Sequence, residues 1–130
     1  MAVGVQALRD PISPGDPFFA WWHACRPGVP RAFLTKMAED ASAMPAARWR
    51  SILEQLGRTD LTGSARTVQQ ETLIIGGASD PLFGEAHQQA LLRAFPDADF
   101  VGIEGCGHNP HWEDPALVAA AITGKFGAAT

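Results

Sequence analysis

The feature that most constrains the fold is an alternation of short apolar runs and helical patterns in the second half of the chain. Thr72-Leu-Ile-Ile75 is a β-rich run closed by Gly76-Gly77, and Phe100-Val-Gly-Ile103 is a second run of the same kind. We expect two strands here, the first buried on both faces. Apolar residues at helical spacing predict helices over residues 84–95 and 115–126. The order strand, helix, strand, helix indicates parallel strands joined by a right-handed crossover.

In the last of these helices, the residues expected to face inward are Leu117, Val118, Ala121 and Ile122.

The first half of the chain has a different texture, with helical patterns and no strand pattern. Three X-Pro steps, Asp10-Pro11, Ser13-Pro14 and Asp16-Pro17, predict a turn-rich start. Residues 17–25 form a short aromatic helix candidate, and two amphipathic helices are expected over residues 30–41 and 45–56. Their apolar stripes comprise Phe33, Leu34, Met37, Ala38 and Ala41 in the first, and Trp49, Ile52, Leu53 and Leu56 in the second. Residues 57–70 have no sustained period and are expected to form a polar connector.

These patterns predict an α/β chain with a helical segment over residues 1–70 and a β-α-β-α unit over residues 71–130. A chain of 130 residues that is 46% hydrophobic can bury a core of its own. Its net charge of −4, with scattered Lys and Arg, argues against nucleic acid as a partner. No apolar run approaches the roughly 20 residues that span a bilayer, so we expect a soluble, cytoplasmic protein without membrane association. The two cysteines, Cys25 and Cys106, are expected to be reduced and partly buried.

Two residues that could perform chemistry follow the two predicted strands. Asp80 comes just after the first strand, and His108 just after the second. Catalytic groups collect at the carboxyl ends of parallel strands, which lie about 4.8 Å apart, so we expect this carboxylate and imidazole to reach hydrogen-bond contact. An acid that orients a histidine is the arrangement of an acyl-transfer triad, whose chain order of nucleophile, acid and histidine fits these two positions.

Three stretches of the sequence resemble the closing segment of the α/β-hydrolase family. They are Thr72-Leu-Ile-Ile-Gly-Gly-Ala-Ser-Asp-Pro-Leu-Phe83, then Gln88 with Leu91 to Pro96, then Gly105-Cys-Gly-His-Asn-Pro-His-Trp-Glu-Asp-Pro115. Upstream, Leu8-Arg-Asp-Pro11 and the segment from Phe33 to Trp49 are similar to the helical cap of many members. The resemblance therefore implies the C-terminal portion of an α/β-hydrolase, with a cap segment before the β-α-β-α unit.

The resemblance also implies roles for individual residues. Asp80 would be the triad acid and His108 the triad base of an esterase or lactonase, acting on a small-molecule ester or lactone. Neither a metal nor an organic cofactor would be required. The residues expected to bind substrate are Phe83, His111, Trp112, Trp21 and Trp22.

The sequence departs from the family at the nucleophile. A nucleophile elbow needs Gly-x-Ser-x-Gly at a tight strand-to-helix turn, and this sequence contains no such pentapeptide. The oxyanion-hole loop of the family is missing as well. We expect one of three situations: the chain is a fragment, its gene is truncated, or a partner supplies the rest. The partner would be a missing N-terminal half or a second copy of the chain. Two strands leave two unpaired edges, and this favours a homodimer.

Other interpretations of the same residues stay open. Asp80 could be a turn residue before proline, and His108 a structural histidine in a glycine-rich loop. Cys106 could replace the serine as nucleophile. A metal site is a further possibility, with ligands from His108, His111, Glu113, His87 and Cys106. The aromatic residues of the first helix could pack in a core rather than line a pocket.

A second function, of another class, is a non-catalytic truncated paralogue. Such a protein would use its cap aromatics to bind a ligand or to dimerise.

Overall fold

The structure is a computed structural model that describes residues 2–127. The chain forms two compact units. A helical unit contains the residues up to Ala24 and Gly28–Asp60, and a sheet unit contains Cys25–Pro27 and the residues from Leu61 onward. The expected division into a cap-like segment over residues 1–70 and a core portion over residues 71–130 stays a prediction.

The helical unit contains four helices. They are α1 (Ala2–Ala7), α2 (Pro17–Trp22), α3 (Arg31–Ser42) and α4 (Ala46–Arg58). The expected helices over residues 17–25, 30–41 and 45–56 are present with shifted ends. The turn-rich start is present only over residues 8–16, because residues 2–7 form a short helix before the prolines begin.

The core of the helical unit is a cluster of apolar side chains from all the helices except α3. It consists of Val5, Leu8, Ile12, Phe18, Phe19, Ala46 and Trp49. Trp49 is buried in this cluster, whereas Ile52 and Leu56 of the same stripe are exposed at 42% and 62%. Phe33 on α3 is exposed at 38%. Each predicted stripe is therefore covered only at part of its length.

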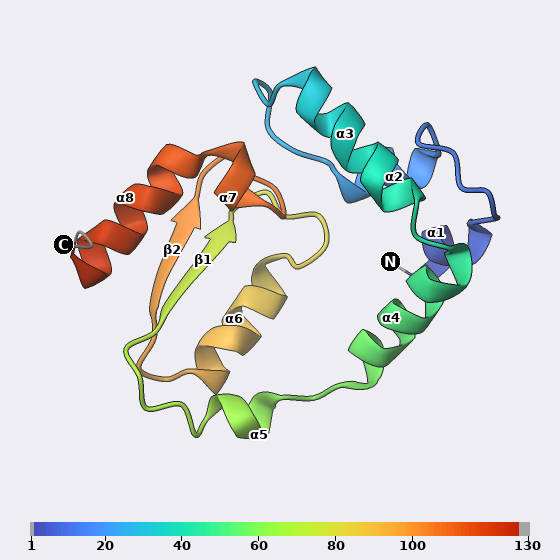
Figure 1. The fold of residues 1–130 in the computed structure, drawn as a ribbon. Coiled ribbons are helices and arrows are strands. Elements are labelled where there is room, and N and C mark those ends of the chain that lie inside the picture. The colour runs from blue at the N-terminus through green and yellow to red at the C-terminus, as the bar shows by residue number, and fades with distance from the viewer. Residues whose placement is uncertain (1, 128–130) are drawn as a thin grey trace. The chain divides into compact units, whose positions relative to one another are not determined.

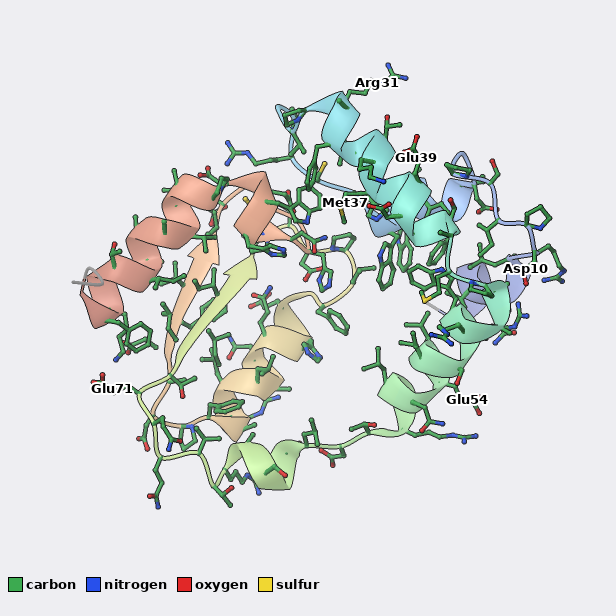
Figure 2. All side chains as sticks on the ribbon, in the orientation of Figure 1. Asp10, Arg31, Met37, Glu39, Glu54 and Glu71 are labelled. Atoms are coloured by element: carbon green, nitrogen blue, oxygen red, sulfur yellow. The ribbon has the colours of Figure 1, made fainter. Side chains whose placement is uncertain are left out.

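Polar contacts fix where the helices of this unit begin. The Asp16 carboxylate accepts a 2.9 Å hydrogen bond from the Phe18 N–H and caps α2. Asp10, which Figure 2 labels beside α4, accepts a 2.9 Å bond from the N–H of Ala46, the first residue of that helix. This long-range cap replaces the side-chain cap that Pro45 cannot supply.

The sheet unit has the predicted parallel order. Strand β1 (Leu73–Gly77) pairs with β2 (Asp99–Ile103) in parallel, from Leu73 opposite Asp99 to Gly77 opposite Ile103. Helix α6 (Glu85–Ala94) connects the strands, and α8 (Pro115–Phe126) follows them. In Figure 1 the strand pair stands between α6 and α8, and both arrowheads point toward α7 (Pro110–Glu113). Both catalytic candidates follow these arrowheads in the sequence.

Two one-turn helices were absent from the sequence-based expectation. Helix α7 follows the histidine loop, and α5 (Thr62–Ala65) interrupts the predicted polar connector. Each has only four residues, which is too short to establish a period in the sequence.

Burial in the sheet unit is lower than the sequence predicted. Residues 73–76 of β1 are half-buried, not buried on both faces, because β2 is the strand's only partner in residues 2–127. On α8, Leu117 and Ile122 were expected to face inward but are exposed at 50% and 45%. The described part of the chain contains no helix long and apolar enough to cross a membrane.

Candidate active site

The first half of the site is a tight turn that follows β1 and holds Asp80. Its Oδ1 accepts hydrogen bonds from the N–H groups of Leu82, at 2.7 Å, and Phe83, at 3.0 Å. These bonds form an Asx-type turn before Pro81. The carboxylate is only 8% exposed, and its Oδ2 is directed to the neighbouring loop. The turn explanation for Asp80 is thus correct for one oxygen, while the other oxygen meets the histidine.

The second half is the glycine-rich loop that follows β2 and holds His108. Gly105 has a φ of +72°, a left-handed conformation that favours glycine. Backbone bonds tie this loop to the first one, from Ala78 N–H to Ile103 O at 3.0 Å and from Ser79 N–H to Cys106 O at 2.9 Å. Main-chain hydrogen bonds therefore hold the two strand ends together independently of the Asp80 and His108 side chains.

Across this junction, His108 Nδ1 lies 2.9 Å from Asp80 Oδ2. The structure thus brings together the two residues that the strand order predicted would meet. The imidazole is 30% exposed, so it retains access to solvent. Whether the pair is catalytic stays a prediction at this point.

The electrostatics of the pair favour an ionised acid. Burial opposes ionisation of Asp80, but the hydrogen bonds with His108 and with the N–H groups of Phe83 and Leu82 outweigh it and lower the pKa of this carboxyl. A carboxylate that stays charged can hold a protonated Nδ1 and stabilise the ring when it gains a second proton.

The other expected substrate-binding residues lie in two places. The Phe83 ring is 5.2 Å from the His108 ring and 4.6 Å from His87, so it forms a wall of the histidine site. His111 and Trp112 lie on α7, directly after the histidine loop, with His111 exposed and Trp112 half-buried. They come three and four residues after His108 in the sequence.

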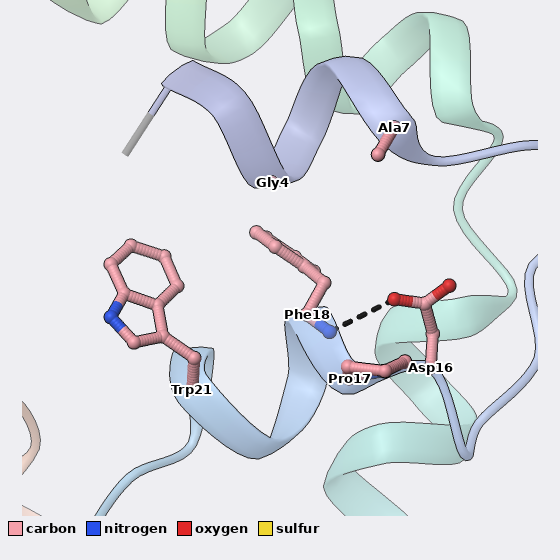
Figure 3. Close-up of a pocket in the computed structure, with 6 residues that line it drawn as sticks. All are labelled: Gly4, Ala7, Asp16, Pro17, Phe18 and Trp21. Carbon is pink, nitrogen blue, oxygen red and sulfur yellow. Dashed lines mark hydrogen bonds between the residues drawn. The ribbon is translucent and has the colours of Figure 1, made fainter.

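Trp21 and Trp22 belong to the helical unit. Trp22 packs against Phe18 and Trp49, with ring centroids 5.6 and 5.2 Å away. Trp21 instead lines a hollow of about 550 Å³ together with Phe18, Asp16 and the α1 residues Gly4 and Ala7 (Figure 3). Both tryptophans pack against the core of the helical unit, and Trp21 also borders an open, mainly apolar space within that unit.

The surroundings of the two cysteine thiols argue against a cysteine nucleophile. Cys106 is fully buried, and the Arg26 guanidinium donates to its Sγ at 4.0 Å. Cys25 is half-buried, and burial together with the nearby Glu113 raises the pKa of its thiol. Neither favours an exposed thiolate, which is the form that attacks a substrate.

Glu113 has a structural position that the sequence did not reveal. Its carboxylate, 8% exposed, accepts bonds from the backbone N–H groups of Gly107, Asn109 and Arg26. The sequence suggested it as a possible metal ligand. Between residues 2 and 127 the structure contains no group of three or more His, Cys, Asp or Glu side chains that could hold a metal ion. The only sequence signal for the observed role was a glycine-rich loop whose N–H groups need an acceptor.

The alpha/beta hydrolase family matches residues 2–121. No curated protein matches the chain significantly.

Three solved structures are similar. They are E-2-(acetamidomethylene)succinate hydrolase (24% identity, TM-score 0.66), MGS-M2, an α/β hydrolase from a Medee basin deep-sea metagenome library (23%, 0.58), and a membrane phospholipase A described as a bacterial virulence factor (23%, 0.65). The matches cover 85%, 77% and 89% of this chain but only 43%, 36% and 40% of those chains. The chain thus spans less than half the length of these structures, which share its fold.

Proposed function

We propose that this chain, which belongs to the α/β-hydrolase family, supplies the acid and the base of a carboxylic ester or lactone hydrolase. The observation that carries the proposal is the 2.9 Å contact between His108 Nδ1 and Asp80 Oδ2 at the carboxyl ends of adjacent parallel strands. In this arrangement, Asp80 orients the ring and His108 acts as general base.

The proposed reaction uses a serine from residues outside this sequence. With Nδ1 protonated and bonded to Asp80, Nε2 accepts the serine proton while the serine oxygen bonds to the substrate carbonyl carbon. His108 then gives that proton to the leaving alkoxide as the C–O bond breaks. Water hydrolyses the acyl-enzyme in the same way, with His108 again taking and returning one proton. In a lactone the leaving oxygen stays attached to the acyl chain.

The substrate surfaces in this proposal are apolar. Phe83, whose ring lies 5.2 Å from that of His108, would contact the acyl or alcohol part next to the reacting carbon. His111 and Trp112 on the adjoining α7 would extend this wall. A substrate-binding role of Trp21 and Trp22 stays a prediction. A cytoplasmic location also stays a prediction.

The test pairs the chain with the polypeptide encoded upstream of it and treats the mixture with a fluorophosphonate probe and a p-nitrophenyl ester. We expect labelling of a serine on that polypeptide, and we expect turnover that His108→Ala removes. Gln89→Ala on α6 is the control, because this exposed side chain belongs neither to the acid–base pair nor to the proposed substrate wall, and its loss should leave turnover in place. Turnover that survives His108→Ala would show that the mechanism is wrong. If the probe labelled this chain and not the other polypeptide, the proposal of an outside serine would be wrong as well.

A non-catalytic, dimerising module is the second candidate, and two observations favour it. Large apolar side chains on α8 are exposed at 45–50%, namely Leu117, Ile122 and Phe126, and each strand has one unpaired edge among the described residues. Surfaces of this kind attract another chain. A stable dimer with no ester turnover in any mixture would favour this function, while a clean 13.9 kDa monomer in gel filtration would contradict it.

A further inference from the structure

Glu113 accepts hydrogen bonds from the backbone on both sides of His108. Its carboxylate accepts from Gly107 N–H at 2.9 and 3.0 Å and from Asn109 N–H at 3.1 Å, and these two residues are the immediate neighbours of the histidine. The third donor is the Arg26 N–H, at 2.8 Å, from a segment 87 residues earlier in the chain. One buried side chain thus fixes three main-chain positions around the imidazole.

The opposite side of the same loop is also fixed. A Cβ on Gly77 would overlap the carbonyl oxygen of Gly107 and the main chain of Cys106, so the loop lies directly on the end of β1. The backbone beside His108 is thus in contact with both Gly77 and Glu113, and the His108 side chain lies 2.9 Å from Asp80. Asp80 is likewise fixed, because its Oδ1 accepts two backbone N–H groups.

The carboxylate form of Glu113 suits this task because all three partners are donors. An ionised carboxylate only accepts hydrogen bonds, whereas the amide of glutamine would turn an NH₂ group toward at least one of these N–H groups. The Arg26 guanidinium does not neutralise Glu113, because it pairs with Asp114 and contacts Cys106 Sγ. The three backbone N–H groups are therefore the donors that the structure provides to this buried side chain.

We infer that Glu113 is a positioning residue for His108, which holds the histidine loop in register with Asp80 and ties it to the Cys25–Pro27 segment. The importance of this role for catalysis rests on the proposed hydrolase function, but the geometry can be tested without any turnover. Glu113 acts through the backbone of the loop and does not contact the reacting atoms.

The test is NMR on the full chain, combining amide hydrogen exchange with the imidazole signals of His108. We compare Glu113→Gln with Asp114→Asn, a neighbouring change that removes the negative charge of the Arg26 ion pair but breaks no bond to the histidine loop, and whose amide oxygen can still cap α8. In Glu113→Gln, the Gly107 and Asn109 amides should exchange at least about tenfold faster relative to the β1–β2 amides, equivalent to about 1.4 kcal/mol of local opening. The Nδ1–H signal of His108 should weaken as well, while Asp114→Asn should preserve both features.

Two results would overturn the inference. One is a Glu113→Gln protein whose His108 and loop signals match those of Asp114→Asn. The other is equal acceleration in the loop and in the strands, which would mean a merely structural role. If Glu113→Gln does not fold, the unaltered chain decides: Gly107 and Asn109 amides that exchange as fast as the exposed Gly105 amide contradict the inference, and protected ones support it. Failure of the ester assay would leave these readouts unaffected.

Discussion

Gly77→Ala should destabilise the sheet unit by about 2–4 kcal/mol. The new Cβ would overlap the carbonyl oxygen of Gly107 and the main chain of Cys106, and backbone atoms cannot rotate away as a side chain does. Overpacking of this kind typically costs about 1–3 kcal/mol. Lifting the loop also stretches the 2.9 Å bond from Ser79 N–H to Cys106 O, which contributes about 1 kcal/mol. Because His108 is on this loop, the contact with Asp80 should weaken in the same variant.

The assay is equilibrium urea unfolding followed by far-UV circular dichroism, with all proteins at one concentration. Gly63→Ala is the matched control, because a Cβ at Gly63 meets nothing within 4 Å and the residue lies in helix α5 of the same unit. The control should be neutral or slightly stabilising, since alanine favours helix more than glycine does. A free energy of unfolding for Gly77→Ala within about 0.5 kcal/mol of the unaltered chain would refute the close packing of the two loops.

Two further predictions concern titration and thiol exposure. The pKa of Asp80 is lowered in the folded chain, so its ionisation stabilises the fold above its unfolded pKa of about 3.9, and that stability is lost as the pH falls through the lower folded value. Urea unfolding between about pH 5 and pH 2 should therefore show a smaller loss of stability in Asp80→Asn than in the unaltered chain; equal losses would contradict this. With a thiol reagent under native conditions, half-buried Cys25 should react slowly and buried Cys106 only after unfolding, as mass spectrometry can show. Rapid modification of native Cys106 would be inconsistent with the packing around Arg26.

The long elements were predictable from sequence because their signals are local. The apolar run ending at Gly77 and the helical spacing over residues 84–95 each specify one element, and their alternation specifies parallel pairing. Asp80 and His108 could be placed together for the same reason, since both follow strand ends that must be neighbours. The family comparison supports this fold over residues 2–121.

What the sequence did not reveal depends on contacts between distant residues. Glu113 and Arg26 meet across 87 positions, and no local pattern indicates that a glutamate will accept backbone N–H groups. The exposure of Leu117 on α8 was missed because its spacing shows which face of a helix is apolar, not whether anything covers it. Helices of one turn, such as α7, are too short to produce a periodic signal.

The central claim is that His108 donates a hydrogen bond from Nδ1 to Asp80, and NMR of ¹⁵N-labelled histidine tests it most directly. The account predicts that neutral His108 carries its proton on Nδ1, with a low-field signal that disappears in Asp80→Asn while Asp114→Asn keeps it. Two results would contradict the claim that Asp80 and His108 form an acid–base pair. One is a neutral His108 ring protonated on Nε2, and the other is an Nδ1–H signal that Asp80→Asn does not change.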